Sequence, residues 1–100
     1  MKLALTLAAA LTLPAAAHAA VSGFHDSAAQ IATLLQSEAV ADALRQMPVT
    51  QVELERTLPD GVLVWEVEGP GCSVDVRLKP LPPQGPGRTT YEITGIGPCD

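Results

Sequence analysis

The sequence has few of the side chains that carry chemistry. Its 100 residues include 6 Lys and Arg in total, 2 His, 2 Cys, and 1 each of Phe, Tyr and Trp. So few basic residues argue against a nucleic acid or an anionic lipid surface as partner, since both are bound through clusters of Lys and Arg. A glycine-rich phosphate-binding loop is also absent, because the glycines lie in turns beside prolines.

The N-terminal residues have the pattern of a secretory signal peptide. Lys2 supplies the basic start, residues 3–13 are an uncharged apolar run, and Ala17-His18-Ala19 is a small-x-small cleavage site. The apolar run is shorter than the roughly 20 residues that a transmembrane helix needs. We therefore predict a signal peptide over residues 1–19, cleavage after Ala19, no membrane span in the mature chain, and a periplasmic or secreted location.

The mature chain, residues 20–100, is long enough for a single small domain and too short for two. Lys2 leaves with the signal peptide, so 5 basic residues remain against 11 acidic ones, a formal charge of −6. This charge favours solubility and a basic partner, which in this compartment would be another exported protein.

Cys72 and Cys99 both lie in the mature chain. In an exported protein the natural interpretation is one disulfide, which would close a loop of 26 intervening residues. A pair of free thiols or a metal site is the alternative, but two cysteines without a nearby histidine are a poor zinc set.

His25 is the only histidine of the mature chain, so a Ser-His-Asp or Cys-His arrangement would have to use it. We expect it in a short N-terminal lead-in, where a rigid catalytic geometry is hard to hold. Asp26 is adjacent, but two neighbouring ligands do not make a metal site. An amino-terminal copper site would need histidine where Ser22 stands. We therefore expect no enzyme activity and no cofactor.

Residues 26–47 have helical periodicity. Asp26 or Ser27 is a suitable N-cap for a first helix, and Ser37 is one for a second helix, or for the second half of a kinked one. Pro48 is predicted to end the helical region. Two apolar stripes at helical spacing are predicted to face the core, the first being Phe24, Ala28, Ile31, Leu34 and Leu35 and the second Val40, Ala43, Leu44 and Met47.

After Pro48 the apolar residues alternate, as in strands. A first strand contains Val52 and Leu54, a turn follows at Pro59-Asp60-Gly61, and a second strand contains Leu63, Trp65 and Val67. A three-residue loop between these two strands would place the apolar positions of one strand opposite the polar positions of the other. We therefore expect a four-residue loop or a bulge, placing Leu54 opposite Val67 and Arg56 opposite Trp65.

Two further strands are predicted, one from Cys72 to Lys79 and one over residues 88–96. Residues 80–87 are predicted to be a stiff loop, because proline lacks the donor that a strand interior needs. If the disulfide fixes the hairpin register, the partners of Val76, Leu78 and Pro80 are Gly95, Ile93 and Tyr91, in that order. The predicted fold is α+β, with the helix pair or kinked helix on a four-stranded antiparallel meander.

The stretches Ser37–Leu44, Val49–Glu55 and Val64–Glu68 together resemble the PepSY-type module, in which a short helix leads into strands of this kind. The resemblance covers about 30 residues. It implies an exported module of a class linked to protease propeptides and protease inhibition. The chain departs from the family pattern at the disulfide and the proline loop, and it lacks the usual glycine-terminated last hairpin. The architecture is also similar to that of cystatin-like inhibitors, but their Gln-x-Val-x-Gly loop is absent. We transfer no functional residues from either family.

The outward side of the first hairpin is acidic, with Glu53, Glu55, Glu66 and Glu68 on one face. A solvated sheet face is the simplest interpretation, and a calcium or basic-peptide surface is the alternative. The candidate interaction surface consists of Pro82, Pro83, Gln84, Trp65 and Arg56; for Trp65, its alternation with Leu63 favours core packing instead.

The sequence thus favours a small exported, non-enzymatic binding module, such as a protease-inhibitor-like or envelope accessory protein. A stiff exposed loop supports this hypothesis, because preorganisation lowers the ordering cost of binding. The alternative is a structural or stress-related envelope protein that binds a small ligand or metal on its sheet face.

Overall fold

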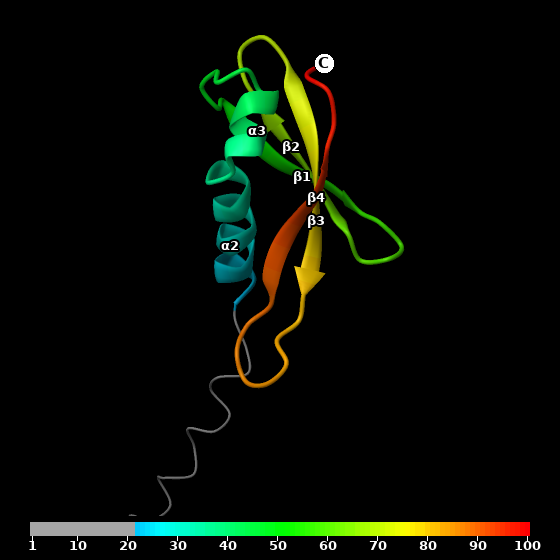
Figure 1. Cartoon of the computed structure of the whole chain (residues 1–100). Helices are drawn as coiled ribbons and strands as arrows, with labels where there is room; N and C mark the ends of the chain where they lie inside the picture. Colours follow the sequence, from blue (N-terminus) through cyan, green and yellow to red (C-terminus); the bar gives the residue numbers. More distant parts are fainter. Residues whose placement is uncertain (1–21) are drawn as a thin grey trace, which may run out of the picture.

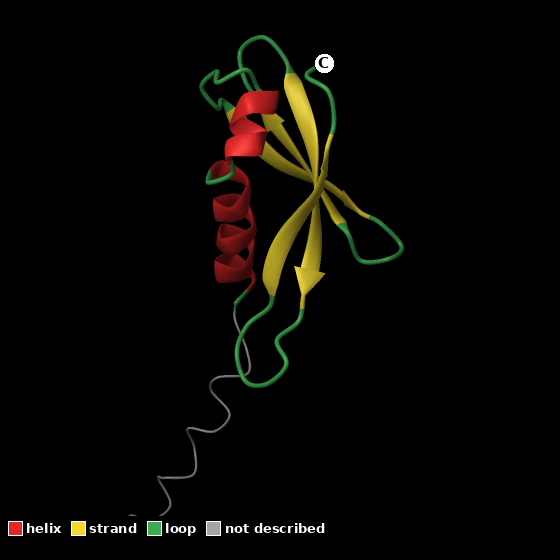
Figure 2. Ribbon diagram, in the orientation of Figure 1, coloured by secondary structure: helices red, strands yellow, loops and turns green. Residues whose placement is uncertain are grey.

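The computed structural model describes residues 22–100, which form a helical layer on one face of a β-sheet (Figures 1 and 2). The elements are α2 (Gly23–Leu35), α3 (Glu38–Ala43), β1 (Gln51–Thr57), β2 (Leu63–Glu68), β3 (Ser73–Leu81) and β4 (Thr90–Ile96). The strands form an antiparallel meander in the order β1-β2-β3-β4. The α+β fold predicted from the sequence is confirmed. The predicted signal peptide lies outside the described residues.

Helix α2 begins earlier than the sequence predicted. Its N-cap is Ser22, whose Oγ accepts a hydrogen bond from the backbone N–H of His25 at 3.2 Å. The predicted start at Asp26 or Ser27, after a short lead-in, is therefore wrong. Asp26 lies instead in the first turn, where a carboxylate offsets the positive end of the helix dipole.

The break between the two helices occurs where it was predicted, with Ser37 as the N-cap of α3. The prediction that Pro48 ends the helical region is wrong, because the chain turns out of the helix before it. Arg45 and Gln46 adopt left-handed backbone angles, with φ of 62° and 58°. The side-chain amide of Gln46 then folds back and donates to Oδ1 of Asp42 at 2.7 Å, which holds this turn. No helix of residues 22–100 is long and apolar enough to cross a bilayer.

The core lies between the helices and one face of the sheet. Leu34, Val40 and Leu44 point inward from the helical layer. The helix stripe predicted from the sequence is wrong at three positions, since Phe24 is 78% exposed, Leu35 is 49% exposed and Ala28 is exposed as well. From the sheet, the buried residues of the core cluster are Trp65, Val67, Val74, Val76 and Leu78, which alternate along β3 as predicted. In β2 the alternation is interrupted, because Val64, predicted on the outward side, is also buried at 1% exposure.

A polar network ties α2 to the sheet within this core. The indole Nε1–H of Trp65 donates to Oε1 of Gln30 at 2.9 Å. The amide Nε2 of Gln30 donates to Asp26 at 3.2 Å and to the hydroxyl of Tyr91 at 3.3 Å. That hydroxyl in turn donates to the other carboxylate oxygen of Asp26 at 2.6 Å. Every buried side-chain polar atom of residues 22–100 has a hydrogen-bond partner.

The predicted irregularity in the first hairpin is a β-bulge at Glu55. The register shifts between Leu54 and Arg56, which pair with Trp65 and Val64. The expected pairs Leu54–Val67 and Arg56–Trp65 are therefore wrong. A bulge leaves one residue without a cross-strand partner and restores the alternation on both sides.

The second hairpin follows the predicted register near its loop and departs from it further along. Leu78–Ile93 and Pro80–Tyr91 are partners as predicted, but Val76 pairs with Ile96 because a second irregularity interrupts the ladder. Strand β3 also continues through Pro80 to Leu81, so the prediction that the loop begins at Pro80 is wrong. Beyond Leu78, β3 has β4 alone as a neighbour, and a proline is tolerated where one side of a strand is free.

The disulfide Cys72–Cys99 joins the start of β3 to the segment after β4, with the two Cα atoms 5.3 Å apart. Beside it, the backbones of Ser73 and Asp100 exchange two hydrogen bonds of 3.0 and 2.9 Å. The disulfide predicted from the sequence is thus confirmed. It anchors the C-terminal segment along β3.

Candidate functional site

A row of three carboxylates crosses the sheet face that the helices leave open. Glu53 on β1 is the partner of Glu66 on β2, and Glu66 is the partner of Asp75 on β3. Like charges directly opposite each other destabilise a sheet. By contrast, Lys79 and Glu92 form a pair of opposite charges further along the same face.

The bulge adds a fourth carboxylate to this row. Oxygen atoms of Glu55, Glu66 and Asp75 lie within 4.8 Å of one another. Partial loss of hydration around its carboxylate, followed by repulsion from Asp75 and Glu66, raises the pKa of Glu55, while the Arg56 guanidinium, 3.4 Å away, lowers it. Ser73 donates to Glu66 at 3.2 Å. Glu55, Glu66 and Asp75 line an open hollow of about 220 Å³.

Chemically, this group offers oxygen ligands of the kind that hard cations prefer, and a strongly negative surface for basic side chains. Glu53, Glu55 and Glu66 were predicted to share this face. Asp75 was not connected with them, because the row across strands becomes visible only once the register is known.

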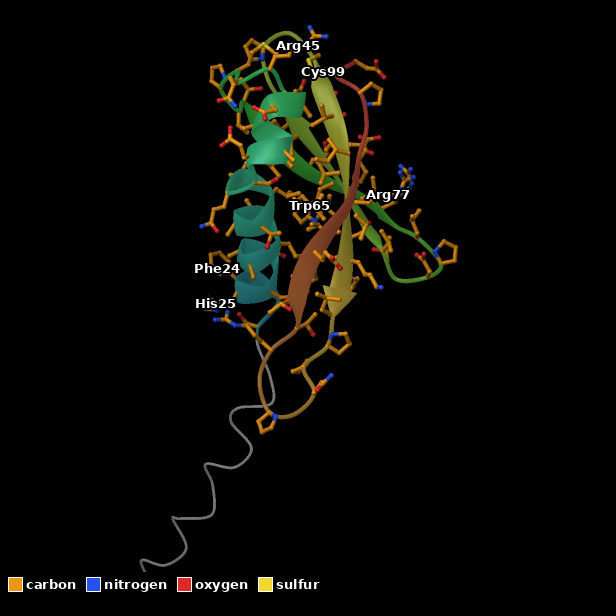
Figure 3. The ribbon with its side chains drawn as sticks, viewed as in Figure 1. Phe24, His25, Arg45, Trp65, Arg77 and Cys99 are labelled. Carbon is orange, nitrogen blue, oxygen red and sulfur yellow. A yellow bond between two sulfur atoms is a disulfide. The ribbon has the colours of Figure 1, made fainter. Side chains whose placement is uncertain are left out.

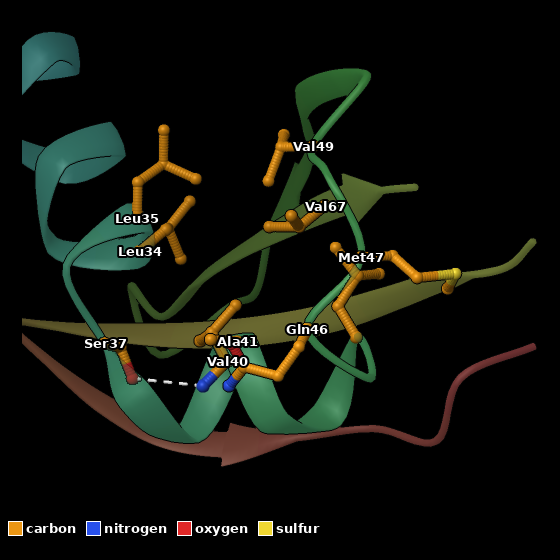
Figure 4. Close-up of a pocket in the computed structure, with 10 residues that line it drawn as sticks. Leu34, Leu35, Ser37, Val40, Ala41, Gln46, Met47, Val49 and Val67 are labelled. Atoms are coloured by element: carbon orange, nitrogen blue, oxygen red, sulfur yellow. Dashed lines mark hydrogen bonds between the residues drawn. The ribbon is translucent and has the colours of Figure 1, made fainter. Parts of the chain in front are cut away.

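Apolar residues lie uncovered beside the β1 edge, and we call this group the ledge. It consists of Val52 and Leu54 on the helix-side face of β1, Val49 just before the strand, and Leu35 at the C-terminal end of α2. Leu35, Val49 and Leu54 are 49%, 43% and 44% exposed, and Val52 is partly buried. Leu35 and Val49 of the ledge also line a cleft of about 90 Å³ between α2, α3, the segment before β1 and strand β2 (Figure 4). The floor of this cleft is apolar, formed by residues that include Leu34, Val40 and Val67.

The ledge is open because the helical layer lies off-centre. Helix α2 packs mainly on β4, and α3 packs on β3. Strand β1 lies at the far edge of the sheet, and every one of its residues except Val52 is exposed. Within the part of the chain that the structure describes, β1 pairs with β2 on one side and with no strand on the other.

The residues of the predicted interaction surface do not come together. Pro82, Pro83 and Gln84 are exposed in the loop between β3 and β4, and Arg56 is exposed on β1. Trp65 is only 5% exposed and lies between α2 and the sheet (Figure 3), so it is not on the surface.

His25 lies on the exposed side of α2 (Figure 3). Its Nδ1 is 2.9 Å from Ser22 Oγ, the atom that also caps the helix. The neighbouring carboxylate of Asp26 points to Tyr91 and Gln30. Ser22 and His25 therefore meet at the helix start, and the Asp26 carboxylate is engaged with Tyr91 and Gln30.

Comparison of the chain with protein-family models, with curated proteins and with solved structures finds no match. The features of the described residues that bear on function are the ledge, the edge of β1 and the acidic row. The sequence signals for the ledge were weak, because Leu35 and Leu54 have the spacing of core residues.

Proposed function

We propose that the chain is a periplasmic or secreted, non-enzymatic module that binds another exported protein through the ledge and the edge of β1. One observation carries this proposal. Three of the five large apolar side chains that are exposed in residues 22–100, Leu35, Val49 and Leu54, belong to the ledge beside an unpaired strand edge, whereas Phe24 and Leu81 lie elsewhere. Exposed strand edges tend to pair with other chains, and natural proteins usually cover or blunt them.

The confirmed disulfide supports the export part of the proposal, since disulfides persist in oxidising compartments. The resemblance to PepSY-type modules, which also occur in exported proteins, supports it too. The hydrogen bonding of Ser22 with His25 at the start of α2, and of Asp26 with Tyr91 and Gln30, supports a binding role over an enzymatic one.

Site-specific cross-linking in the cells that produce the protein tests the proposal. A photo-activatable phenylalanine analogue replaces Leu54 in the ledge or, as a matched control, Leu81. Leu81 is a strand leucine of comparable exposure, 36% against 44%, on the opposite half of the sheet. Irradiation is expected to give a discrete adduct with one exported protein from position 54 and none from position 81.

Mass spectrometry of the adduct identifies the partner, and binding of that purified partner to the unmodified protein completes the test. Equal adduct yields from both positions, or no adduct from position 54 in a correctly oxidised protein, would contradict the proposal.

A further inference from the structure

We infer that the occupant of the β1 edge is an extended segment in which basic and apolar residues alternate, added to the sheet as a fifth strand. This inference rests on the proposed function and states the chemistry of the partner. Strand addition of this kind gains affinity from backbone hydrogen bonds and specificity from alternate side chains. The partner chemistry follows from the two rows of residues that reach β1.

On the open face, the row that reaches the edge is acidic. Glu53 is the edge member of the row that continues through Glu66 and Asp75. A basic side chain placed beside Glu53 would become its cross-strand partner. Because pairs of opposite charge stabilise a sheet and like pairs destabilise it, this addition relieves a repulsion that the free protein retains.

On the helix side, the rows that reach the edge are apolar. Val52 is the partner of Val67, and Leu54 is the partner of Trp65. Val67 and Trp65 are both buried in the core. Side chains that flank Val52 and Leu54 from an added strand would lie on the ledge and cover it. Since successive side chains of a strand point to opposite faces, apolar residues must alternate with the basic ones.

A second copy of this chain is a poor occupant of the same edge. When two β1 strands pair antiparallel with Val52 and Leu54 kept on the helix side, the register centred on Glu53 places Glu53 opposite Glu53, and the register centred on Leu54 places it opposite the bulged Glu55. Both registers add carboxylate repulsion to the repulsion already present. The register centred on Val52 places Glu53 opposite Gln51, but within β1 it pairs residues 51–53 alone. The bulge at Glu55 also ends regular pairing, so it limits the added segment to the first half of β1.

Fluorescence anisotropy with a labelled nine-residue peptide that alternates arginine and valine tests the inference on the oxidised, secreted protein. Three control peptides separate its elements. One has glutamate in place of arginine, one has the arginines and valines in separate blocks, and one is N-methylated at alternate backbone positions so that it cannot donate to a strand. Only the original peptide is expected to bind.

Two variants locate the peptide. Glu53→Lys and Leu54→Ser are each expected to weaken binding by about fivefold or more. Their matched controls, Glu92→Lys on the other edge strand and Leu81→Ser, are expected to change it less than about twofold. All four residues are exposed. Circular dichroism verifies that the variants fold.

Equal binding of the N-methylated or the block peptide would overturn strand addition, and equal effects of Glu53→Lys and Glu92→Lys would overturn the location. A dimer seen by analytical ultracentrifugation and lost in Leu54→Ser would assign the edge to a second copy. If no peptide binds while position 54 still cross-links a partner, the inference fails and the proposed function stands.

Discussion

The indole of Trp65 and the side chain of Gln30 meet at 2.9 Å, and this hydrogen bond joins the middle of the sheet to the middle of α2. Gln30 is 7% exposed and is the only buried polar residue of the described chain. Its amide also reaches Asp26 and Tyr91, so one side chain links three others across the core. Buried polar groups are expensive unless they are fully paired, and here the pairing fixes how α2 lies on the sheet.

We expect Gln30→Ala to lower the free energy of unfolding by about 2 kcal/mol, because it leaves the buried Trp65 N–H without an acceptor. Urea unfolding followed by circular dichroism measures the change. Gln36→Ala is the matched control, since Gln36 is exposed at the end of the same helix. If both variants unfold at the same urea concentration, the network does not stabilise the core.

The network also illustrates what the sequence could not predict. The helices, the strand alternation, the disulfide and an irregularity in the first hairpin all follow from local patterns. The partner of Gln30 does not, because Trp65 lies 35 positions further along the chain. A glutamine between apolar helix positions has the pattern of a solvated residue unless the fold supplies its partners.

The candidate site was predicted only in part for a related reason. The acidic face of the first hairpin is visible in the alternation of Glu53, Glu66 and Glu68 with apolar residues. The addition of Asp75 and the position of Glu55 depend on cross-strand register, which a single bulge changes. Leu35 and Leu54 have core spacing, and their exposure follows from where the short helical layer ends.

Tyr91 provides a spectroscopic probe of the same network. Burial, followed by its hydrogen bond to Asp26, raises the pKa of Tyr91 above its ordinary value of 10.0. Its contribution to stability is therefore fully present below pH 10 and is lost as the pH rises through the higher pKa of the folded state.

Because Tyr91 is the only tyrosine, absorbance at about 295 nm reports its ionisation alone. We expect the titration midpoint of the folded protein to lie above that of the protein unfolded in urea. Asp26→Asn removes the carboxylate that opposes ionisation and is expected to lower the folded midpoint. Identical midpoints for folded and unfolded protein would show that the Tyr91 hydroxyl is not held as described.

The contribution of Glu55 to the free energy of unfolding is expected to depend on pH in the opposite sense to that of most surface carboxylates. Its pKa is raised from 4.5 in the folded protein, so its effect on stability is most favourable below pH 4.5 and is lost as the pH rises through the raised value. Glu55→Gln removes the repulsion with Glu66 and Asp75. We expect it to raise the urea midpoint at pH 7 and to leave it almost unchanged at pH 4.

Glu92→Gln is the control for this prediction, because Glu92 faces Lys79 across the strands and loses a favourable pair when it is neutralised. Its urea midpoint at pH 7 is expected to fall slightly or to stay the same. A decrease of similar size in both variants would mean that the carboxylates of the acidic row do not repel one another.

The disulfide is expected to be the largest single contribution to stability. It closes a loop between residues 27 positions apart, and a loop of that length corresponds to about 3–4 kcal/mol in the chain-entropy model. Replacing Cys72 and Cys99 together by serine should therefore lower the urea midpoint by more than any change described above. Reduction of the unmodified protein should have the same effect and add the mass of two hydrogen atoms.

The backbone pairing of Ser73 with Asp100 depends on the same anchor, so the amide of Asp100 should lose its protection from hydrogen exchange in the double variant. If the serine variant retains both its midpoint and this protection, the sheet holds the C-terminal segment without the disulfide.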